Sequence, residues 1–162
     1  MRNVLFLCTG NSARSIMAEG LLRHWGDGMF SAFSAGSHPA GAVNPLALEQ
    51  LSARGVETSG LRSKSWDEFG DDGAPVMNLV ITVCDDVANE ACPILPGSPL
   101  RLHWGLPNPA AALGGEAAQR DAFKTVCDRL EQRIAQLVTI PFADRDPVSV
   151  QSDLEAIAAA TV

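Results

Sequence analysis

A short apolar run that leads through a tight polar loop into a helical pattern is the feature that most restricts the fold of this chain. In the run "NVLFL" (residues 3–7) the four residues after Asn3 are continuously apolar, which is typical of a strand buried on both faces. Apolar side chains then recur at helical spacing from Ser15 onward: Ile16, Met17, Leu21, Leu22 and Trp25. Glycines at positions 26 and 28 end this helical pattern. The amino-terminal segment is therefore predicted to be a buried strand followed by a helix.

Strand-like and helix-like segments continue to alternate along the chain. Three more runs, at 29–36, 78–84 and 100–104, are predicted strands, and residues 45–55, 123–137 and 149–160 have helical patterns. This alternation predicts an α/β fold, a three-layer structure with a four-stranded parallel sheet and helices on both faces. Ligands of such sheets bind at the carboxyl ends of the strands. Cys8, Cys84 and the residues after Trp104 are therefore expected to converge.

Length and charge limit the class of protein. A chain of 162 residues corresponds to one domain, and a net charge of −7 without a basic cluster argues against nucleic acid as a partner. No apolar run approaches the roughly 20 residues of a membrane span, and no secretory leader is recognisable. Four cysteines are too few for a secreted disulfide scaffold. We expect a cytoplasmic protein that binds neither nucleic acid nor membrane.

The loop "CTGNSAR" (residues 8–14) has the composition of an anion-binding site. At a strand-to-helix turn its backbone N–H groups can point at one centre, and Arg14 can clamp two oxygens of a tetrahedral anion. The same positive potential favours the thiolate of Cys8, to which Ser15 could donate a hydrogen bond. The alternative is that Cys8 is a small buried side chain that ends a strand. The predicted oxyanion-binding residues are Thr9, Gly10, Asn11, Ser12, Ala13 and Arg14.

Several longer motifs resemble one protein family. "VLFLCTGNSARSIMAEG", "FSAGSHPAGAVNPLALEQL", "SKSWDEF", "VITVCDDVANEACPILPG" and "HWGLPNPAA" are similar to the low-molecular-weight protein tyrosine phosphatase superfamily, and most similar to its arsenate reductase branch. The resemblance covers residues 1–140 and implies a flavodoxin-like catalytic domain. Residues 141–162 lie outside the motifs and are expected to form a carboxyl-terminal extension with a short helix, either as part of the same domain or as a packing arm.

The resemblance implies a thiol relay that reduces arsenate to arsenite and confers arsenical resistance. In this relay Cys8 attacks the oxyanion, Cys84 attacks Cys8, and Cys92 attacks Cys84. The disulfide is then reduced by an external thiol partner, thioredoxin or glutaredoxin, and no tightly bound cofactor is implied. The alternative for Cys84 is a buried strand-end residue, with Cys92 incidental. Cys127 lies on the apolar face of a predicted helix and is expected to belong to the core.

Asn108 departs from the family pattern, which has an aspartate as general acid at this position. An asparagine can donate a hydrogen bond but cannot supply a proton, so ester hydrolysis is expected to suffer by about 10²–10⁴ in rate. The chain also contains no tyrosine, whereas the phosphatase branch has a pair of them beside its acid. Arsenate reduction is therefore favoured over ester hydrolysis. The alternatives are a phosphatase that hydrolyses phosphomonoesters and a catalytically impaired oxyanion-binding domain.

Four residues match positions that hold a potassium ion in some family members: Asn11, Glu19, Ser34 and Asp67. The alternative is that Asn11 and Ser34 brace the loop by hydrogen bonds.

Overall fold

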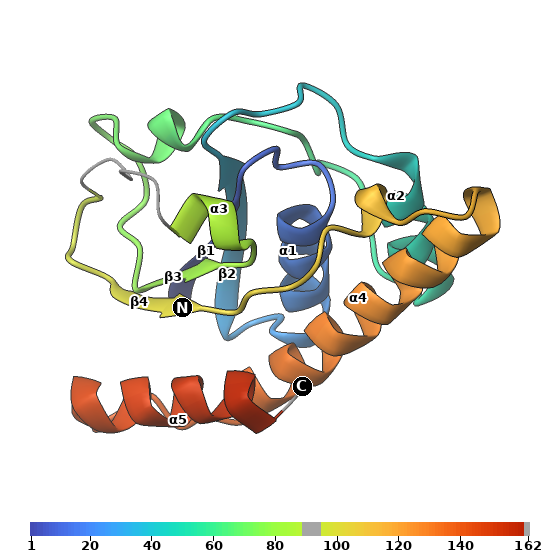
Figure 1. The fold of residues 1–162 in the computed structure, drawn as a ribbon. Helices are drawn as coiled ribbons and strands as arrows, with labels where there is room; N and C mark the ends of the chain where they lie inside the picture. Colours follow the sequence, from blue (N-terminus) through green and yellow to red (C-terminus); the bar gives the residue numbers. More distant parts are fainter. Residues whose placement is uncertain (89–94, 161–162) are drawn as a thin grey trace.

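Four parallel strands form the centre of the molecule. The computed structural model describes residues 1–88 and 95–160. The sheet has the order β2-β1-β3-β4 (Figure 1), which confirms the predicted four-stranded parallel α/β fold. In register, Cys8 pairs with Gly36 and Leu7 pairs with Thr82, so β1, β2 and β3 end at the same edge. The strands are β1 (Arg2–Cys8), β2 (Phe30–Gly36), β3 (Leu79–Thr82) and β4 (Leu100–His103).

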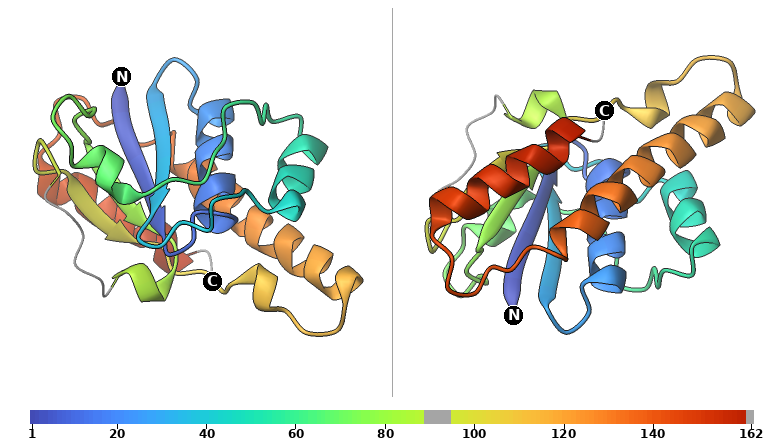
Figure 2. Two further views of the ribbon diagram at one scale, coloured as in Figure 1. Left: turned by 90° about the horizontal axis from the view of Figure 1, so that it is seen from above. Right: turned by 90° about the horizontal axis from the view of Figure 1, so that it is seen from below.

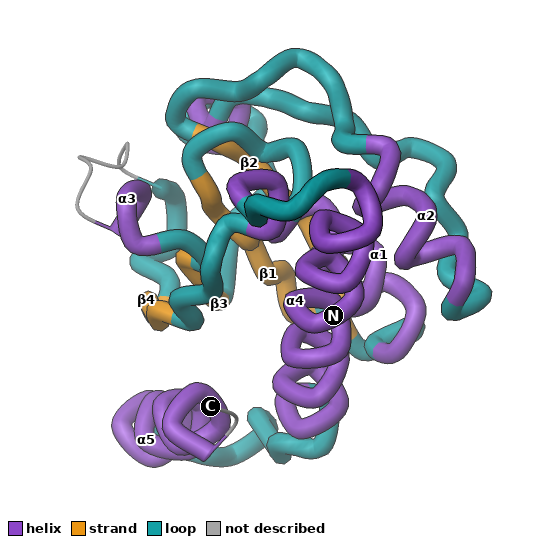
Figure 3. The backbone as a smooth tube through the Cα atoms, turned by 45° about the vertical axis from the view of Figure 1, so that its right-hand side comes forward, coloured by secondary structure: helices purple, strands orange, loops and turns teal. Residues whose placement is uncertain are grey.

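Long helices cover one face of the sheet. Helix α1 packs on β1 and β2 and also contacts α4 and α2, and α5 packs on β4. Figure 2 shows α1, α2 and α4 grouped on one side, and Figure 3 shows α1 and α4 side by side with α5 apart from them near β4. These helices are α1 (Arg14–Trp25), α2 (Pro45–Ala53), α4 (Glu116–Leu137) and α5 (Pro147–Ala160).

The opposite face is covered by a short element. The Ser34 side chain contacts α1, so its neighbour Phe33 points to the other face of the sheet. There the Phe33 ring packs edge-on against Phe69, at 5.8 Å between ring centroids. Phe69 ends the 3₁₀ helix η1 (Trp66–Phe69). The chain therefore buries both faces of the sheet, as its continuously apolar strands require.

The carboxyl-terminal segment joins the same core. Phe142 packs edge-on against Phe30 at 5.7 Å between centroids, and the Gln151 amide donates to the Arg101 carbonyl of β4 at 2.9 Å. The α5 side chains of Val150, Leu154 and Ile157 are buried in the main hydrophobic cluster. The segment that the sequence suggested as an extension thus packs on the sheet. None of the helices in the described ranges has the length and apolar character needed to cross a membrane.

Two short helices follow the strands at their carboxyl ends. Helix α3 (Asp85–Ala88) begins directly after Cys84, and η2 (Pro109–Ala111) begins directly after Asn108. Together with the loop between β1 and α1, these segments place Cys8, Cys84 and Asn108 at one edge of the sheet.

Candidate active site

The loop carbonyls point outward. Thr9, Gly10 and Ser12 accept hydrogen bonds from the backbone N–H groups of residues 38, 40 and 44, at 2.8–2.9 Å. In a trans peptide the C=O and the following N–H point in opposite directions. The N–H groups of residues 10, 11 and 13 therefore point inward, and that of Asn11 donates to Cys8 Sγ at 3.2 Å. This is the geometry of an anion-binding nest.

The Cys8 thiol lies among hydrogen-bond donors. Its sulfur is 2.9 Å from Ser15 Oγ and accepts the Asn11 N–H, and all three residues are buried. Such contacts stabilise the thiolate, the reactive form of a cysteine. The loop also needs Gly36 beside it, because a Cβ there would lie 2.5 Å from the Thr9 carbonyl oxygen. Cys8 therefore has the surroundings of a nucleophile.

Asn11 braces the loop through its side chain. Its φ of 45° lies in the left-handed region, which asparagine tolerates. The amide nitrogen donates to Ser15 Oγ at 2.8 Å and to Ser34 Oγ at 3.0 Å, while Oδ1 accepts the Lys64 backbone N–H at 2.9 Å. The side chain thus holds the loop to β2 and to the segment before η1.

Arg14 connects the loop to the segment after β4. Its Nη1 donates to the Leu106 carbonyl at 3.0 Å, and the Leu106 N–H donates to the Val83 carbonyl at 3.2 Å. Asn108 follows two residues later. It is exposed, and its Oδ1 accepts the Ala110 N–H at 3.1 Å as the N-cap of η2. An aspartate would cap equally well, so asparagine preserves the local structure and removes only the acidic proton.

Cys84 lies beside the loop. Its Sγ is 3.5 Å from Thr9 Oγ1, and the residue is 2% exposed. Cys8 and Cys84 thus emerge from the ends of neighbouring strands, β1 and β3. Cys92, the third cysteine of the expected relay, lies outside the described residues.

A polar chain beside Cys84 was missed by sequence reasoning. Thr82 Oγ1 is 2.6 Å from His103 Nδ1, and His103 Nε2 is 2.8 Å from Asp85 Oδ1. His103 therefore connects the ends of β3 and β4 to the start of α3. The available signal was that Thr82 and His103 end two neighbouring parallel strands, and the structure pairs them in register.

Three of the four potassium candidates converge. Ser34 Oγ donates to Glu19 Oε1 at 2.6 Å and accepts from Asn11. Asp67 is exposed, and its backbone bonds to Ser65 and Gly70. In the described part of the chain Asp67 shares no hydrogen bond or ion pair with the other three residues, and its role as an ion ligand stays a prediction. Sequence reasoning also missed Lys64, whose ammonium lies 3.6 Å from Glu19 Oε1.

Cys127 lies in the core of the molecule. It is fully buried on α4, and burial raises the pKa of its thiol to about 12.

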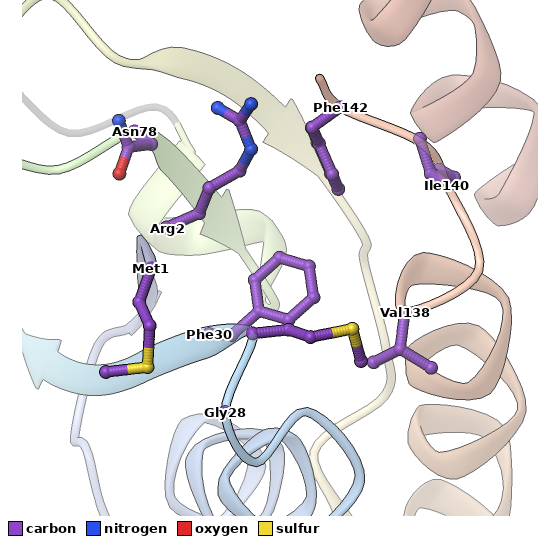
Figure 4. A pocket seen from close by; sticks show the side chains of 9 residues that line it. Met1, Arg2, Gly28, Phe30, Asn78, Val138, Ile140 and Phe142 are labelled. Atoms are coloured by element: carbon purple, nitrogen blue, oxygen red, sulfur yellow. The ribbon is translucent and has the colours of Figure 1, made fainter.

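A cavity of about 530 Å³ lies at the opposite edge of the sheet, at the amino ends of β1 and β2. Figure 4 shows Phe30, Phe142, Val138 and Ile140 around it, with the Arg2 guanidinium reaching between Asn78 and Phe142. Its lining contains none of the predicted site residues. The chemistry is therefore assigned to the carboxyl edge.

Known proteins are similar to this chain over most of its length. An arsenate reductase of Bacillus licheniformis is 39% identical over 134 residues, covering 82% of this chain and 92% of that protein. The solved structure of an arsenate reductase in the phosphate binding state superposes with a TM-score of 0.66 at 27% identity, over 85% of this chain and 97% of that one. A thioredoxin-dependent arsenate reductase of Corynebacterium glutamicum superposes with a TM-score of 0.56 at 30% identity, over 80% of this chain and 58% of that one.

The sequence also matches the low molecular weight phosphotyrosine protein phosphatase family over residues 3–149. This match spans nearly the whole chain and includes the anion-binding loop, Cys84 and Asn108. The chain therefore belongs to the low molecular weight phosphotyrosine protein phosphatase family.

Proposed function

We propose that this protein is an arsenate reductase that uses Cys8, Cys84 and Cys92 in turn. The observation that carries the proposal is the position of Cys84, with Sγ 3.5 Å from Thr9 Oγ1 in the loop that begins at Cys8. A hydrolase needs one thiol and an acid at this edge, whereas a reductase needs a second thiol beside the first. The curated relatives named arsenate reductase support the same activity.

The reaction balances as follows. The Cys8 thiolate attacks arsenic(V) of the arsenate monoanion, a bond forms between sulfur and arsenic, and one hydroxyl takes the proton of the other and leaves as water. Cys84 then attacks Cys8 Sγ, the electron pair of the sulfur–arsenic bond passes to arsenic, and arsenite leaves. Cys92 attacks Cys84 Sγ, releases Cys8 as a thiolate and leaves a Cys84–Cys92 disulfide. Each exchange requires a thiolate attacker and an accessible sulfur.

The loop supplies the binding site in this scheme. The oxyanion is held by the inward N–H groups of residues 10, 11 and 13 and by the guanidinium of Arg14. Thr9 and Ser12 complete the loop, and their carbonyls point away from the anion. Ser15 holds the Cys8 sulfur in place for attack. Phosphate has the same charge and shape as arsenate and is expected to compete for the loop.

A dithiol protein of the thioredoxin type is the proposed reductant, as in the Corynebacterium glutamicum relative described as thioredoxin-dependent. A relay that ends in a disulfide requires a compartment that reduces disulfides, so we further propose a cytoplasmic location. Glutaredoxin is the competing reductant, and supplying each partner separately distinguishes them.

Phosphomonoester hydrolysis is the second candidate function, and Asn108 argues against it. A phenolate needs a proton to leave, and the cap of η2 cannot give one. Near neutral pH the arsenate monoanion carries two protons, so one hydroxyl can take the proton of the other and leave as water without an acid at position 108.

The test is a coupled assay in which oxidation of a thioredoxin system is followed with and without arsenate. We expect oxidation that depends on arsenate and stoichiometric arsenite. Hydrolysis of an aryl phosphate without any oxidation would make the protein a phosphatase. Oxyanion binding without either turnover would make it a non-catalytic binding domain.

A further inference from the structure

A charge cluster lies behind the loop. Glu19 of α1 is 1% exposed, and its Oε1 lies 3.6 Å from the ammonium of Lys64, which is 8% exposed. Arg23 approaches the other oxygen to 2.5 Å as an ion pair and is much more exposed, at 41%. The cluster therefore already contains two cations around one buried carboxylate.

Lys64 is held from several directions. Its Nζ donates to the Arg62 carbonyl at 2.8 Å, its backbone N–H donates to Asn11 Oδ1, and its carbonyl accepts the Gly36 N–H at 2.9 Å. Burial lowers the pKa of Lys64, and the opposing charge of Glu19 limits that effect. The ammonium is thus fixed beside the carboxylate by the backbone.

The cluster reaches the nucleophile through hydrogen bonds. Glu19 accepts from Ser34, and Ser34 accepts from the Asn11 amide. The same amide donates to Ser15 Oγ, which contacts Cys8 Sγ at 2.9 Å. A positive charge at Lys64 therefore fixes the carboxylate that orients Ser34, and through it the side chain that braces the loop.

The donor set does not fit a potassium ion. Asn11 Oδ1 faces the Lys64 N–H, so the amide presents its nitrogen to Ser34 where an ion would require oxygen. Asp67 stays exposed on η1. A further cation beside Glu19 would also face the ammonium of Lys64 at close range, and like charges repel strongly where water is excluded.

We propose that Lys64 is the resident cation of this cluster, a positioning residue that occupies the place of a potassium ion and makes the loop independent of potassium. The proposal concerns the organisation of the loop, so it stands whether the protein reduces arsenate or hydrolyses esters.

The first experiment compares the wild type in potassium chloride and in choline chloride at equal ionic strength. The readouts are the thermal midpoint Tm and the rate at which iodoacetamide modifies Cys8, with and without inorganic phosphate. Neither readout uses arsenate turnover, so the result is separable from the test of the proposed function. We expect no change in Tm and less than about a twofold change in rate, because an occupied cluster gains nothing from added ion. A potassium-dependent rise in Tm would overturn the proposal.

The second experiment compares two substitutions that remove the same charge. Lys64→Ala leaves space beside Glu19, and Lys64→Met fills it. Both are expected to lower Tm by about 5 to 10 °C, because Glu19 loses its buried partner but keeps Arg23. Methylammonium, which replaces the lost ammonium, should restore most of the loss in Lys64→Ala and none of it in Lys64→Met.

Lys124→Ala is the matched control, since Lys124 is an exposed lysine that also pairs with a carboxylate. It should behave like the wild type in both salts. Equal losses in the two Lys64 variants that no cation restores would count against the proposal, because Lys64 would then act through packing. A Lys64→Ala protein identical to the wild type would overturn it as well. If neither variant folds, the wild-type salt comparison still decides.

Discussion

Cys8 and Cys127 are equally buried and chemically opposite. Cys8 is 3% exposed and Cys127 is 0% exposed, and both belong to the main hydrophobic cluster. The sulfur of Cys8 nevertheless contacts a hydroxyl and a backbone N–H, whereas burial raises the pKa of the Cys127 thiol. Burial alone therefore does not decide whether a thiol reacts. The partners that remain after water is excluded decide it.

The difference follows from where each residue lies in the fold. Cys8 ends β1, where a turn into α1 presents successive N–H groups and a helix N-terminus. Cys127 lies in the middle of α4, where the backbone polar groups are already paired within the helix. A strand end thus provides donors to a thiol that a helix interior cannot provide.

The strongest test of this comparison replaces each thiol with serine. Cys8→Ser should abolish arsenite formation, by at least about a thousandfold, because a hydroxyl is a far weaker nucleophile at neutral pH. Cys127→Ser should keep the rate within about twofold, since no step uses that sulfur. Single-turnover arsenite formation is the measurement. Equal losses of arsenite formation in the two variants would contradict the distinction between a reactive Cys8 and an unreactive Cys127.

Removing one partner of Cys8 should have a smaller effect. Ser15→Ala deletes the hydroxyl 2.9 Å from the sulfur and an acceptor of the Asn11 amide. A hydrogen bond to a charged group is worth about 1.5–3 kcal/mol, so alkylation of Cys8 should slow by about ten- to a hundredfold. Ser52→Ala, on the exposed side of α2, is the control. An unchanged alkylation rate in Ser15→Ala would show that the hydroxyl does not support the thiolate.

The loop could be predicted because its determinants are local. A strand, five intervening residues and a helix specify the nest around Cys8. Parallel strands end at the same edge of a sheet, and this rule predicted that Cys84 lies beside the nest. Lys64 could not be predicted, because its contact with Glu19 depends on the path of the chain before η1. The exposure of Asp67 depends on the same path, because this residue lies on η1.

Asn108 tests the same point for an acid, because it lies at the carboxyl edge of the sheet with Cys8 and yet has no proton to give to a leaving group. Asn108→Asp should retain the cap of η2 and add an acid, raising the kcat for an aryl phosphate by at least about tenfold with little change in KM. Arsenate reduction should change by less than about twofold. The ratio of variant to wild-type rate is measured for both substrates. Equal ratios would remove the selective role of position 108 in protonating a leaving group.

The smallest effect concerns Cys127 and alkaline pH. Burial raises the pKa of its thiol from the usual 9.0 to about 12, with Glu131 and Asp128 adding to the shift and Arg54 opposing it. A raised pKa in the folded state contributes stability that is fully present below pH 9 and is lost as the pH rises toward 12. At pH 10 the unfolded chain ionises Cys127 and the folded chain does not, which lowers the free energy of unfolding by about 1 kcal/mol.

The difference between the wild type and Cys127→Ala isolates this contribution from every other alkaline titration. The variant should be less stable at pH 7 by about 1 kcal/mol because it leaves a small cavity. Its disadvantage should shrink between pH 9 and pH 11, since the variant has no thiol to ionise. Urea unfolding at each pH gives the two curves. Parallel curves would mean that the thiol ionises equally in both states, and that the core around Cys127 does not hold it in the neutral, unreactive form that distinguishes it from Cys8.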